Sequence, residues 1–188
     1  MVDIGVPIFF IFFLLVLWEL IVRWESTPEW ILPGPIQILK TFGETLPMML
    51  EHTRSTMLEC LLGFAVAIIL AVIIAVVMDE LPLVKKALYP LLITSQTIPT
   101  VSVAPLFIIW FGYGILPKVL VVILMCFFPV AISLLGGLAA VDRDYLELFR
   151  SMGASKIAIF RMVKLPLSLP AFFSGLKISA TYSVMGAV

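Results

Sequence analysis

Residues 58–78 read LECLLGFAVAIILAVIIAVVM. This stretch is apolar along almost its whole length, with Glu59 near its start, and Asp79, Glu80 and Pro82 follow it. A helix that crosses the hydrocarbon core of a bilayer needs about 20 predominantly apolar residues, because each residue advances the helix by about 1.5 Å. The stretch therefore predicts a membrane-spanning helix, and this decides the class of fold.

The composition of the whole chain agrees with a membrane protein. Hydrophobic residues make up 62% of the 188 residues, charged residues make up 13%, and the mean hydropathy is +1.19. Soluble domains typically contain about 45–50% apolar and about 25% charged residues, and a soluble domain of this size exposes too much surface to hide such an excess. The formal net charge is zero, so the charge balance implies no nucleic-acid partner. Cys60 and Cys126 lie within apolar runs, and we expect buried thiols instead of a disulfide or a metal pair.

Further apolar runs on both sides predict further spans, giving five in total. The first run is followed by Trp24 and contains Trp18, which is typical of an interfacial belt at the end of a retained anchor helix and not of a cleaved signal peptide. We therefore predict an all-α membrane protein with an N-terminal anchor helix in residues 1–30. A short amphipathic helix along the membrane surface is expected at Ile36–Thr45. The other predicted spans are Ile4–Val22, Ala87–Phe111 with a polar and proline-rich interruption, Leu116–Leu138, and a last one from near Pro170 to Val188.

Positive charge predicts the orientation of these spans. The connection between the second and third spans and the connection between the fourth and fifth spans fall on the same side by alternation. Loops on the cytoplasmic side of a membrane carry an excess of Lys and Arg, so we assign these connections and the amino terminus to the cytoplasm. The basic residues of the two connections are Lys85, Lys86, Arg143, Arg150, Lys156, Arg161 and Lys164.

The polar segment 142–166 predicts two short helices joined by a tight turn. Asp142 or Asp144 can cap the first helix, and Ser155 can cap the second, which is expected to end before Pro166. Gly153 fits the turn, since glycine adopts a left-handed backbone without strain. On the first helix, Leu146, Phe149 and Met152 share a face beside Tyr145, and such a face fits the groove of a partner. The alternative is an ordinary polar loop.

The same segment resembles the EAA signature of ABC importer permeases. Glu147, Gly153 and the sequence Val163-Lys164-Leu165-Pro166 follow one another at the family spacing, although Leu148 and Phe149 replace the usual paired alanines. In that family the loop forms the coupling helix that docks onto the ATPase subunit. The resemblance implies that the contact and turn residues are Glu147, Phe149, Arg150, Ser151, Met152, Gly153, Ala154, Leu165 and Pro166.

Other short motifs resemble one branch of this family, which imports sulfonates, taurine, nitrate-like anions and the pyrimidine precursor of thiamine. The resemblance covers roughly residues 31–188 and implies a multi-pass helical bundle of the type I importer permeases in a bacterial cell membrane. Such permeases usually have a sixth span, so we expect the sixth span to be missing from a C-terminally incomplete chain. The motifs are Leu32-Pro33-Gly34-Pro35, Leu62-Gly63-Phe64, Gln96-Thr97-Ile98-Pro99, Ala104-Pro105-Leu106 and Trp110-Phe111-Gly112-Tyr113-Gly114.

The resemblance also implies the partners and the solute. It implies two copies of this chain, two copies of an ABC ATPase subunit, an extracellular solute-binding protein and surrounding lipid, with no cofactor. The sequence has no Gly-rich phosphate loop ending in Gly-Lys-Ser/Thr, so ATP hydrolysis is expected in the partner subunit. The expected solute is a thiamine-precursor pyrimidine. The alternatives are a sulfonate, taurine or nitrate-type anion and, from another class, a membrane scaffold that transports nothing.

Polar residues within the proline-broken third run predict a solute path, because irregular backbone at membrane depth is tolerated where it lines a cavity. The alternative is that these side chains hydrogen-bond neighbouring helices. The last span adds an ionisable group, which is costly inside a membrane unless its amine reaches the interface. His52 has no ligand spacing around it, and no catalytic or metal site is predicted. The candidate path residues are Ser95, Gln96, Thr97, Thr100, Ser133, Lys177 and Thr181.

Overall fold

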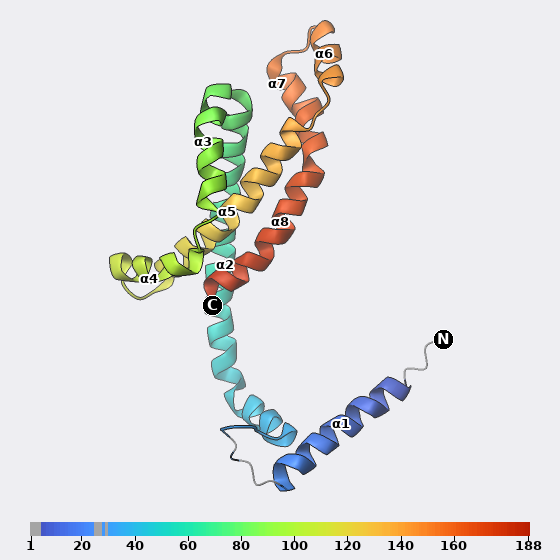
Figure 1. Ribbon diagram of the computed structural model, residues 1–188, viewed down its shortest axis with the longest axis vertical. Coiled ribbons are helices and arrows are strands. Elements are labelled where there is room, and N and C mark those ends of the chain that lie inside the picture. The colour runs from blue at the N-terminus through green and yellow to red at the C-terminus, as the bar shows by residue number, and fades with distance from the viewer. Residues whose placement is uncertain (1–4, 25–27, 29) are drawn as a thin grey trace. The chain divides into compact units, whose positions relative to one another are not determined.

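The computed structural model of the chain describes residues 5–24, 28 and 30–188, and this part of the chain is helical and contains no strand (Figure 1). The predicted all-α fold is therefore confirmed. The helices, in chain order, are α1 (Gly5–Trp24), α2 (Pro35–Glu80), α3 (Pro82–Ser95), α4 (Thr100–Phe111), α5 (Ile115–Ala139), α6 (Arg143–Ser151), α7 (Lys156–Ile159), the π-helical turn η1 (Phe160–Lys164) and α8 (Leu165–Ala187).

The chain divides into two compact units, residues 1–53 and residues 54–188, with the boundary inside α2. In the first unit, the carboxylate of Glu19 pairs with Arg23 Nε at 2.7 Å and accepts a hydrogen bond from the backbone N–H of Ile36 at 3.2 Å. The side chain of Glu19 thus satisfies one of the free N–H groups at the start of α2. The second unit contains the rest of α2 and the helices α3 to α8.

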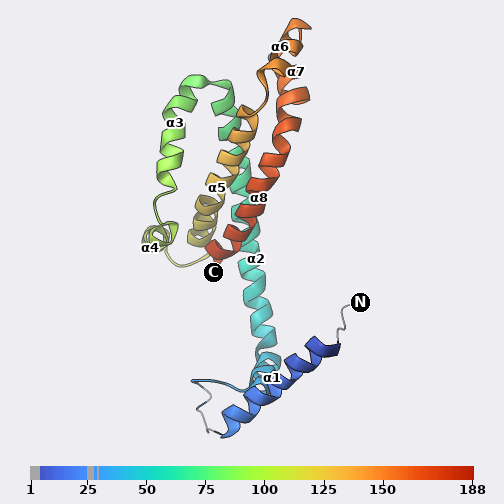
Figure 2. The ribbon, with the colours of Figure 1, turned by 45° about the vertical axis from the view of Figure 1, so that its right-hand side comes forward.

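Four helical runs in the described residues are long and apolar enough to cross a membrane: α1, α2, α5 and the continuous run Lys156–Ala187. The predicted third span is not a single helix, because α3 and α4 are separated by residues 96–99 and α4 lies across the end of the bundle (Figures 1 and 2). The predicted total of five spans is therefore not confirmed.

Prolines interrupt the helices less than the sequence predicts. The helix α2 continues through Pro47, so the separate surface helix expected at Ile36–Thr45 is wrong, and these residues form the first turns of α2. Pro90, Pro105 and Pro129 likewise lie inside helices. A proline removes one backbone hydrogen bond. Unwinding would leave several backbone groups without partners in an apolar medium, so continuing the helix costs less.

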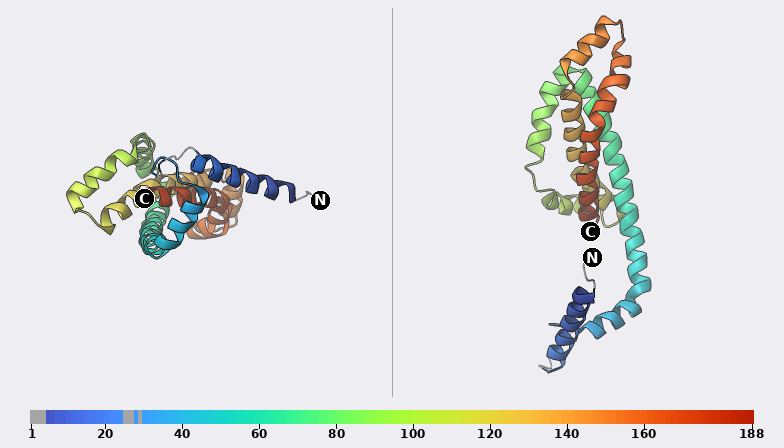
Figure 3. Two further views of the ribbon diagram at one scale, coloured as in Figure 1. Left: turned by 90° about the horizontal axis from the view of Figure 1, so that it is seen from below. Right: turned by 90° about the vertical axis from the view of Figure 1, so that its right-hand side faces the viewer.

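The core of the second unit is formed by α2, α5 and α8, which run side by side (Figure 3). Small residues allow their backbones to approach closely, as is typical of helices packed in membranes. A Cβ atom added at Gly63 of α2 would lie 2.5 Å from Val122 Cγ1 of α5, and one added at Gly175 of α8 would lie 2.9 Å from the carbonyl oxygen of Pro129. The buried small residues are Gly63, Ala67, Ala71 and Ala75 on α2 and Ser168, Gly175, Ser179, Ser183 and Ala187 on α8.

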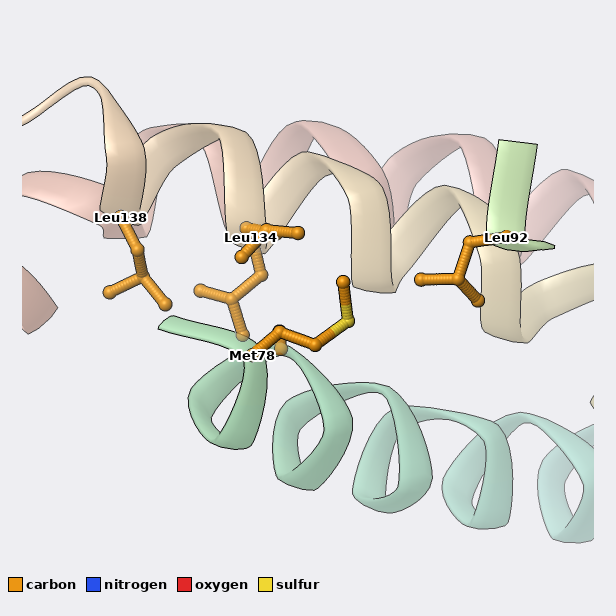
Figure 4. Close-up of a cluster of buried hydrophobic side chains, with 6 residues drawn as sticks. Met78, Leu92, Leu134 and Leu138 are labelled. Atoms are coloured by element: carbon orange, nitrogen blue, oxygen red, sulfur yellow. The ribbon is translucent and has the colours of Figure 1, made fainter. Parts of the chain in front are cut away.

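One end of this core also holds α3 in place. Met78 of α2, Leu92 of α3, and Leu134 and Leu138 of α5 form a buried cluster together with Ala75 and Leu135 (Figure 4). Met78 and Leu138 are almost completely buried, with exposed fractions of 0% and 2%. The chain turns between α2 and α3 at this end, and packing around the cluster directs α3 back along the bundle.

The two cysteines are free and buried, as predicted. The thiol of Cys60 donates to the carbonyl oxygen of Ser183 at 3.3 Å, and the thiol of Cys126 donates to that of Ser179 at 3.2 Å. The hydroxyl of Ser179 donates in return to the carbonyl oxygen of Cys126 at 3.0 Å. These side chains therefore link α2 and α5 to α8 by polar contacts within an apolar interior.

Candidate coupling segment and solute path

Segment 142–166 begins with a capped amphipathic helix. The side chain of Asp142 accepts a hydrogen bond from the backbone N–H of Asp144 at 3.0 Å, so Asp142 is the cap of α6 and Asp144 lies in its first turn. Arg150 lies in the last turn. An acidic first turn and a basic last turn both complement the helix dipole, and α6 is thus stabilised locally by its own sequence.

The turn after α6 has the hydrogen bonds of a Schellman motif. The N–H of Ala154 donates to the carbonyl oxygen of Phe149, and the N–H of Gly153 donates to that of Arg150, both at 3.0 Å. Gly153 has a φ of +77°, which is the left-handed conformation predicted for it. Ser155 then caps α7 by accepting from the N–H of Ala158 at 3.2 Å. The predicted first helix, the turn after it and the cap at Ser155 are confirmed.

The apolar face of α6 is arranged differently from the predicted one. Phe149 and Leu146 are half-buried, whereas Met152 is 74% exposed. Tyr145 and Leu148 are also exposed, and with Met152 they follow the i, i+3, i+7 spacing of one helical face. Leu148 was not predicted as part of the contact face, and Tyr145 was predicted only beside it, although the spacing of Tyr145, Leu148 and Met152 contains the signal. The polar candidates Glu147, Arg150 and Ser151 are exposed on α6.

The second half of the segment does not end before Pro166, and that prediction is wrong. The helices α7, η1 and α8 form one continuous run, in which Leu165 and Pro166 belong to the first turn of α8. Pro166 has no N–H to donate, and a helix tolerates proline in its first turn. The π-helical turn η1 directly precedes this position, and such turns are frequent at functional sites.

An ion pair joins this segment to the bundle. Lys164 Nζ, at the end of η1, lies 2.7 Å from Asp79 Oδ2 near the end of α2. The exposed fraction is 19% for the lysine side chain and 7% for the aspartate side chain. The pair was not predicted from the sequence, where the two residues are far apart. A second ion pair, between Lys118 and Glu59, lies at the other end of α5, with its two closest charged atoms 3.3 Å apart.

A cavity of about 310 Å³ lies between the break after α3 and the helices α5 and α8. It brings together three of the candidate path residues, Ser95, Gln96 and Thr100. Every residue of its lining is uncharged, and hydroxyl, amide and aromatic groups face the cavity together with aliphatic ones. The full lining is Ser95, Gln96, Ile98, Thr100, Leu124, Met125, Phe128, Pro129 and Tyr182.

The other path candidates lie elsewhere. Ser133 packs against Gly175 in the contact between α5 and α8, where a Cβ on the glycine would meet its Oγ at 2.9 Å. Thr97 is exposed and donates from its hydroxyl to the carbonyl oxygen of Thr94 at 2.7 Å. Lys177 and Thr181 are exposed on α8 and are not part of the cavity lining.

Sequence reasoning missed the contribution of α8 to the cavity, which comes from Tyr182. The residue directly follows the candidate Thr181, and its ring with a polar tip was an available signal. Hydropathy alone does not distinguish Tyr182 and Phe128 from other aromatic residues of the apolar helices. Among the residues that the structure describes, no group of three His, Cys, Asp or Glu side chains is placed to hold a metal ion.

Comparison with known proteins identifies the family to which the chain belongs. Residues 63–188 match the family of binding-protein-dependent transport system inner membrane components. The chain belongs to this family. The match includes residues 63–80 of α2, all the residues that line the cavity and the entire 142–166 segment. The chain is a multi-pass membrane permease of an ABC importer, as the sequence predicted.

Several named relatives of this permease resemble it along most of its length. A formylaminopyrimidine transport permease of Halalkalibacterium halodurans is 38% identical over 182 residues, which is 96% of this chain and 72% of the relative. A riboflavin transport system permease of Chloroflexus aurantiacus is 35% identical, covering 98% and 69%. The taurine transport permease of Escherichia coli is 28% identical, covering 88% and 62%. These relatives confirm the predicted branch of the importer permeases.

Proposed function

We propose that this permease is the membrane subunit of an ATP-driven importer for a thiamine-precursor pyrimidine of the formylaminopyrimidine class. The observation that supports this most strongly is the 38% identity to a formylaminopyrimidine permease along almost the whole chain. The relative at 35% identity is named for riboflavin, which is also a flat nitrogen heterocycle. Both solutes, formylaminopyrimidine and riboflavin, can be bound by stacking on their rings and by hydrogen bonds to neutral groups.

The cavity has groups that suit such a solute. Ser95, Gln96 and Thr100 supply hydroxyl and amide groups that hydrogen-bond amino and formyl substituents, while Phe128 and Tyr182 offer aromatic surface to a flat ring. Its volume of about 310 Å³ is at the lower end of the range of small-molecule sites, which is about 300–1,000 Å³. We propose that these lining residues form part of the solute path.

A sulfonate, taurine or nitrate-type anion is the second candidate, supported by the taurine permease at 28% identity. An anion held at membrane depth needs positive or strongly donating groups around it. The cavity lining carries no positive charge, and Lys177 lies on an exposed part of α8. These features favour the neutral heterocycle. The family match favours a transporting permease over the scaffold that transports nothing.

We propose that segment 142–166 is the coupling segment of this importer and lies in the cytoplasm with the amino terminus. The exposed apolar side chains of Tyr145, Leu148 and Met152 would enter a groove on an ABC ATPase subunit, with Glu147 and Arg150 as polar contacts. ATP hydrolysis would take place in that partner. The proposed assembly contains two copies of this chain, two ATPase subunits and an extracellular solute-binding protein.

The test is uptake by the purified importer. The chain would be captured from native membranes with its partners, reconstituted in proteoliposomes, and supplied with ATP and radiolabelled formylaminopyrimidine, riboflavin or taurine. We expect ATP-dependent uptake of formylaminopyrimidine above the other two solutes. Preferred uptake of taurine would support the anion importer, and capture without an ATPase or a binding protein would contradict the proposed assembly.

Two neighbouring residues offer a matched test of the path. Tyr182 lines the cavity and Thr181 does not. Tyr182→Ala is therefore expected to reduce formylaminopyrimidine uptake by about tenfold, equivalent to about 1.4 kcal/mol, whereas Thr181→Ala should leave uptake close to that of the unmodified chain. Equal effects of the two substitutions would remove the cavity from the proposed path.

A further inference from the structure

The ion pair between Asp79 and Lys164 joins two parts of the chain that otherwise meet through apolar packing. Asp79 lies in the last turn of α2, and Lys164 ends the π-helical turn through which α6 and α7 lead into α8. The 2.7 Å separation is that of a charge-assisted hydrogen bond. Ile159 and Val163 are buried on the same run, at 6% and 4% exposure.

The position of Asp79 makes its pairing with lysine important. A carboxylate in the last turn of a helix faces the negative end of the helix dipole, which is unfavourable. With 7% of its side chain exposed, Asp79 is also largely removed from water. An unpaired charge buried in this way is strongly destabilising. The positive charge of Lys164 offsets both penalties. Separating α2 from η1 would restore them, so the end of α2 is expected to follow η1 when η1 moves.

We propose that Asp79 and Lys164 are a positioning pair that transmits movement of the 142–166 segment to α2. The inference rests on the proposed coupling function of that segment. Without the pair, a displacement of α6 and α7 would pass along the continuous run into α8. With the pair, the same displacement also moves the end of α2, which packs against α3 and α5 through Met78. The helices around the cavity then respond together.

A second ion pair provides a matched control for this proposal. Glu59 is a carboxylate on α2 with 4% of its side chain exposed, and it pairs with Lys118 at 3.3 Å. Both carboxylates are buried, both partners are lysines, and both pairs join α2 to another element. Lys118, however, lies in the first turns of α5, at the end remote from segment 142–166. A merely structural role would give both pairs the same effect.

The experiment compares Asp79→Asn, Lys164→Gln and the charge reversal Asp79→Lys/Lys164→Asp with Glu59→Gln in the reconstituted importer. The readout is the amount of formylaminopyrimidine transported per ATP hydrolysed. We expect Asp79→Asn and Lys164→Gln to lower this ratio at least about fivefold, which is the lower end of typical coupling between sites, while ATP hydrolysis continues. The charge reversal should restore the ratio, since a lysine is favourable near the end of α2. Glu59→Gln should lower thermal stability and leave the ratio unchanged.

A second readout separates this proposal from the proposed transport function. Nucleotide binding to the importer should change amide hydrogen exchange in the last turn of α2, residues 77–80, in the unmodified chain and in Glu59→Gln, and this change should be lost in Asp79→Asn. If the importer hydrolyses ATP and takes up no solute, the proposed function fails, and the exchange measurement alone decides the role of the pair. An exchange response that persists in Asp79→Asn, or a transport ratio that falls equally in Glu59→Gln, overturns the proposal.

Discussion

Gly153 occupies a backbone conformation that few other residues adopt, and the space around it is open. Its φ is +77°, and a Cβ atom added there would meet nothing within 4 Å. Any penalty for a larger residue therefore comes from the backbone and not from a clash. For residues other than glycine, the left-handed conformation costs about 1–2 kcal/mol, with asparagine tolerated better than β-branched residues.

Gly153→Val is therefore expected to distort the turn between α6 and α7 and to lower ATP-driven uptake while membrane insertion stays normal. Gly153→Asn serves as the control, because it preserves the left-handed turn at small cost, and it should retain most of the uptake. Uptake in proteoliposomes and the amount of chain in the membrane fraction would be measured for both. Normal uptake by the valine variant would argue against a role for the shape of this turn in coupling.

At the scale of helices, two glycines have very different surroundings: Gly63 lies in a close contact between helices, and Gly136 does not. Gly63 of α2 faces Val122 of α5, and an added Cβ would lie 2.5 Å from Val122 Cγ1 and 3.1 Å from the carbonyl oxygen of Val119. Gly136 of α5 has nothing within 4 Å of the same position. The two glycines are both helical, so they separate close packing from helix propensity.

Gly63→Ala is expected to push α2 and α5 apart and to destabilise the folded chain by about 1–3 kcal/mol, as overpacking typically does. Gly136→Ala should instead stabilise it by about 0.5–1 kcal/mol, because alanine loses less backbone entropy in a helix. Thermal unfolding of the detergent-purified variants would measure both effects. A loss of stability in both variants would contradict the packing of α2 on α5.

At the scale of elements, local chemistry could be predicted from the sequence and breaks at prolines could not. The caps of α6 and α7 and the turn at Gly153 depend on groups within a few residues of one another, so Asp142 and Ser155 could be identified directly. The sequence predicts helix ends at Thr45 and before Pro166, and the structure continues the helix through both positions. Pro90, Pro105 and Pro129 lie inside apolar helices, where the environment penalises unwinding more than the loss of one hydrogen bond.

In the candidate site, too, some residues could be predicted from the sequence and others could not. Ser95, Gln96 and Thr100 could be proposed for the cavity because polar residues in an apolar run are unusual. Tyr182, Phe128 and the partner of Asp79 could not, since their roles depend on how α2, α5 and α8 pack. Ser133 was misplaced for a related reason, because a hydroxyl within a helix contact and a hydroxyl at a cavity look alike in sequence.

For the whole molecule, the main remaining expectation is the orientation in the membrane. The helix α5 joins an exposed loop at residues 112–114 to segment 142–166, and its 25 residues extend about 37 Å, enough to cross a bilayer. The α2–α3 connection lies at the same end of the bundle as α6 (Figure 1). Basic residues are concentrated at that end, so by the positive-inside rule we propose that it lies in the cytoplasm.

Cysteine labelling from one side of the membrane tests this orientation. Tyr113 is 95% exposed before α5, and Asp144 is exposed after it, so Tyr113→Cys and Asp144→Cys place one thiol at each end while leaving the basic residues intact. Cys60 and Cys126 are 6% and 0% exposed and should give little background. A membrane-impermeant maleimide added outside intact spheroplasts is expected to label Tyr113→Cys at once and Asp144→Cys after permeabilisation alone. The reverse pattern would invert the orientation and place segment 142–166 where no ATPase could reach it.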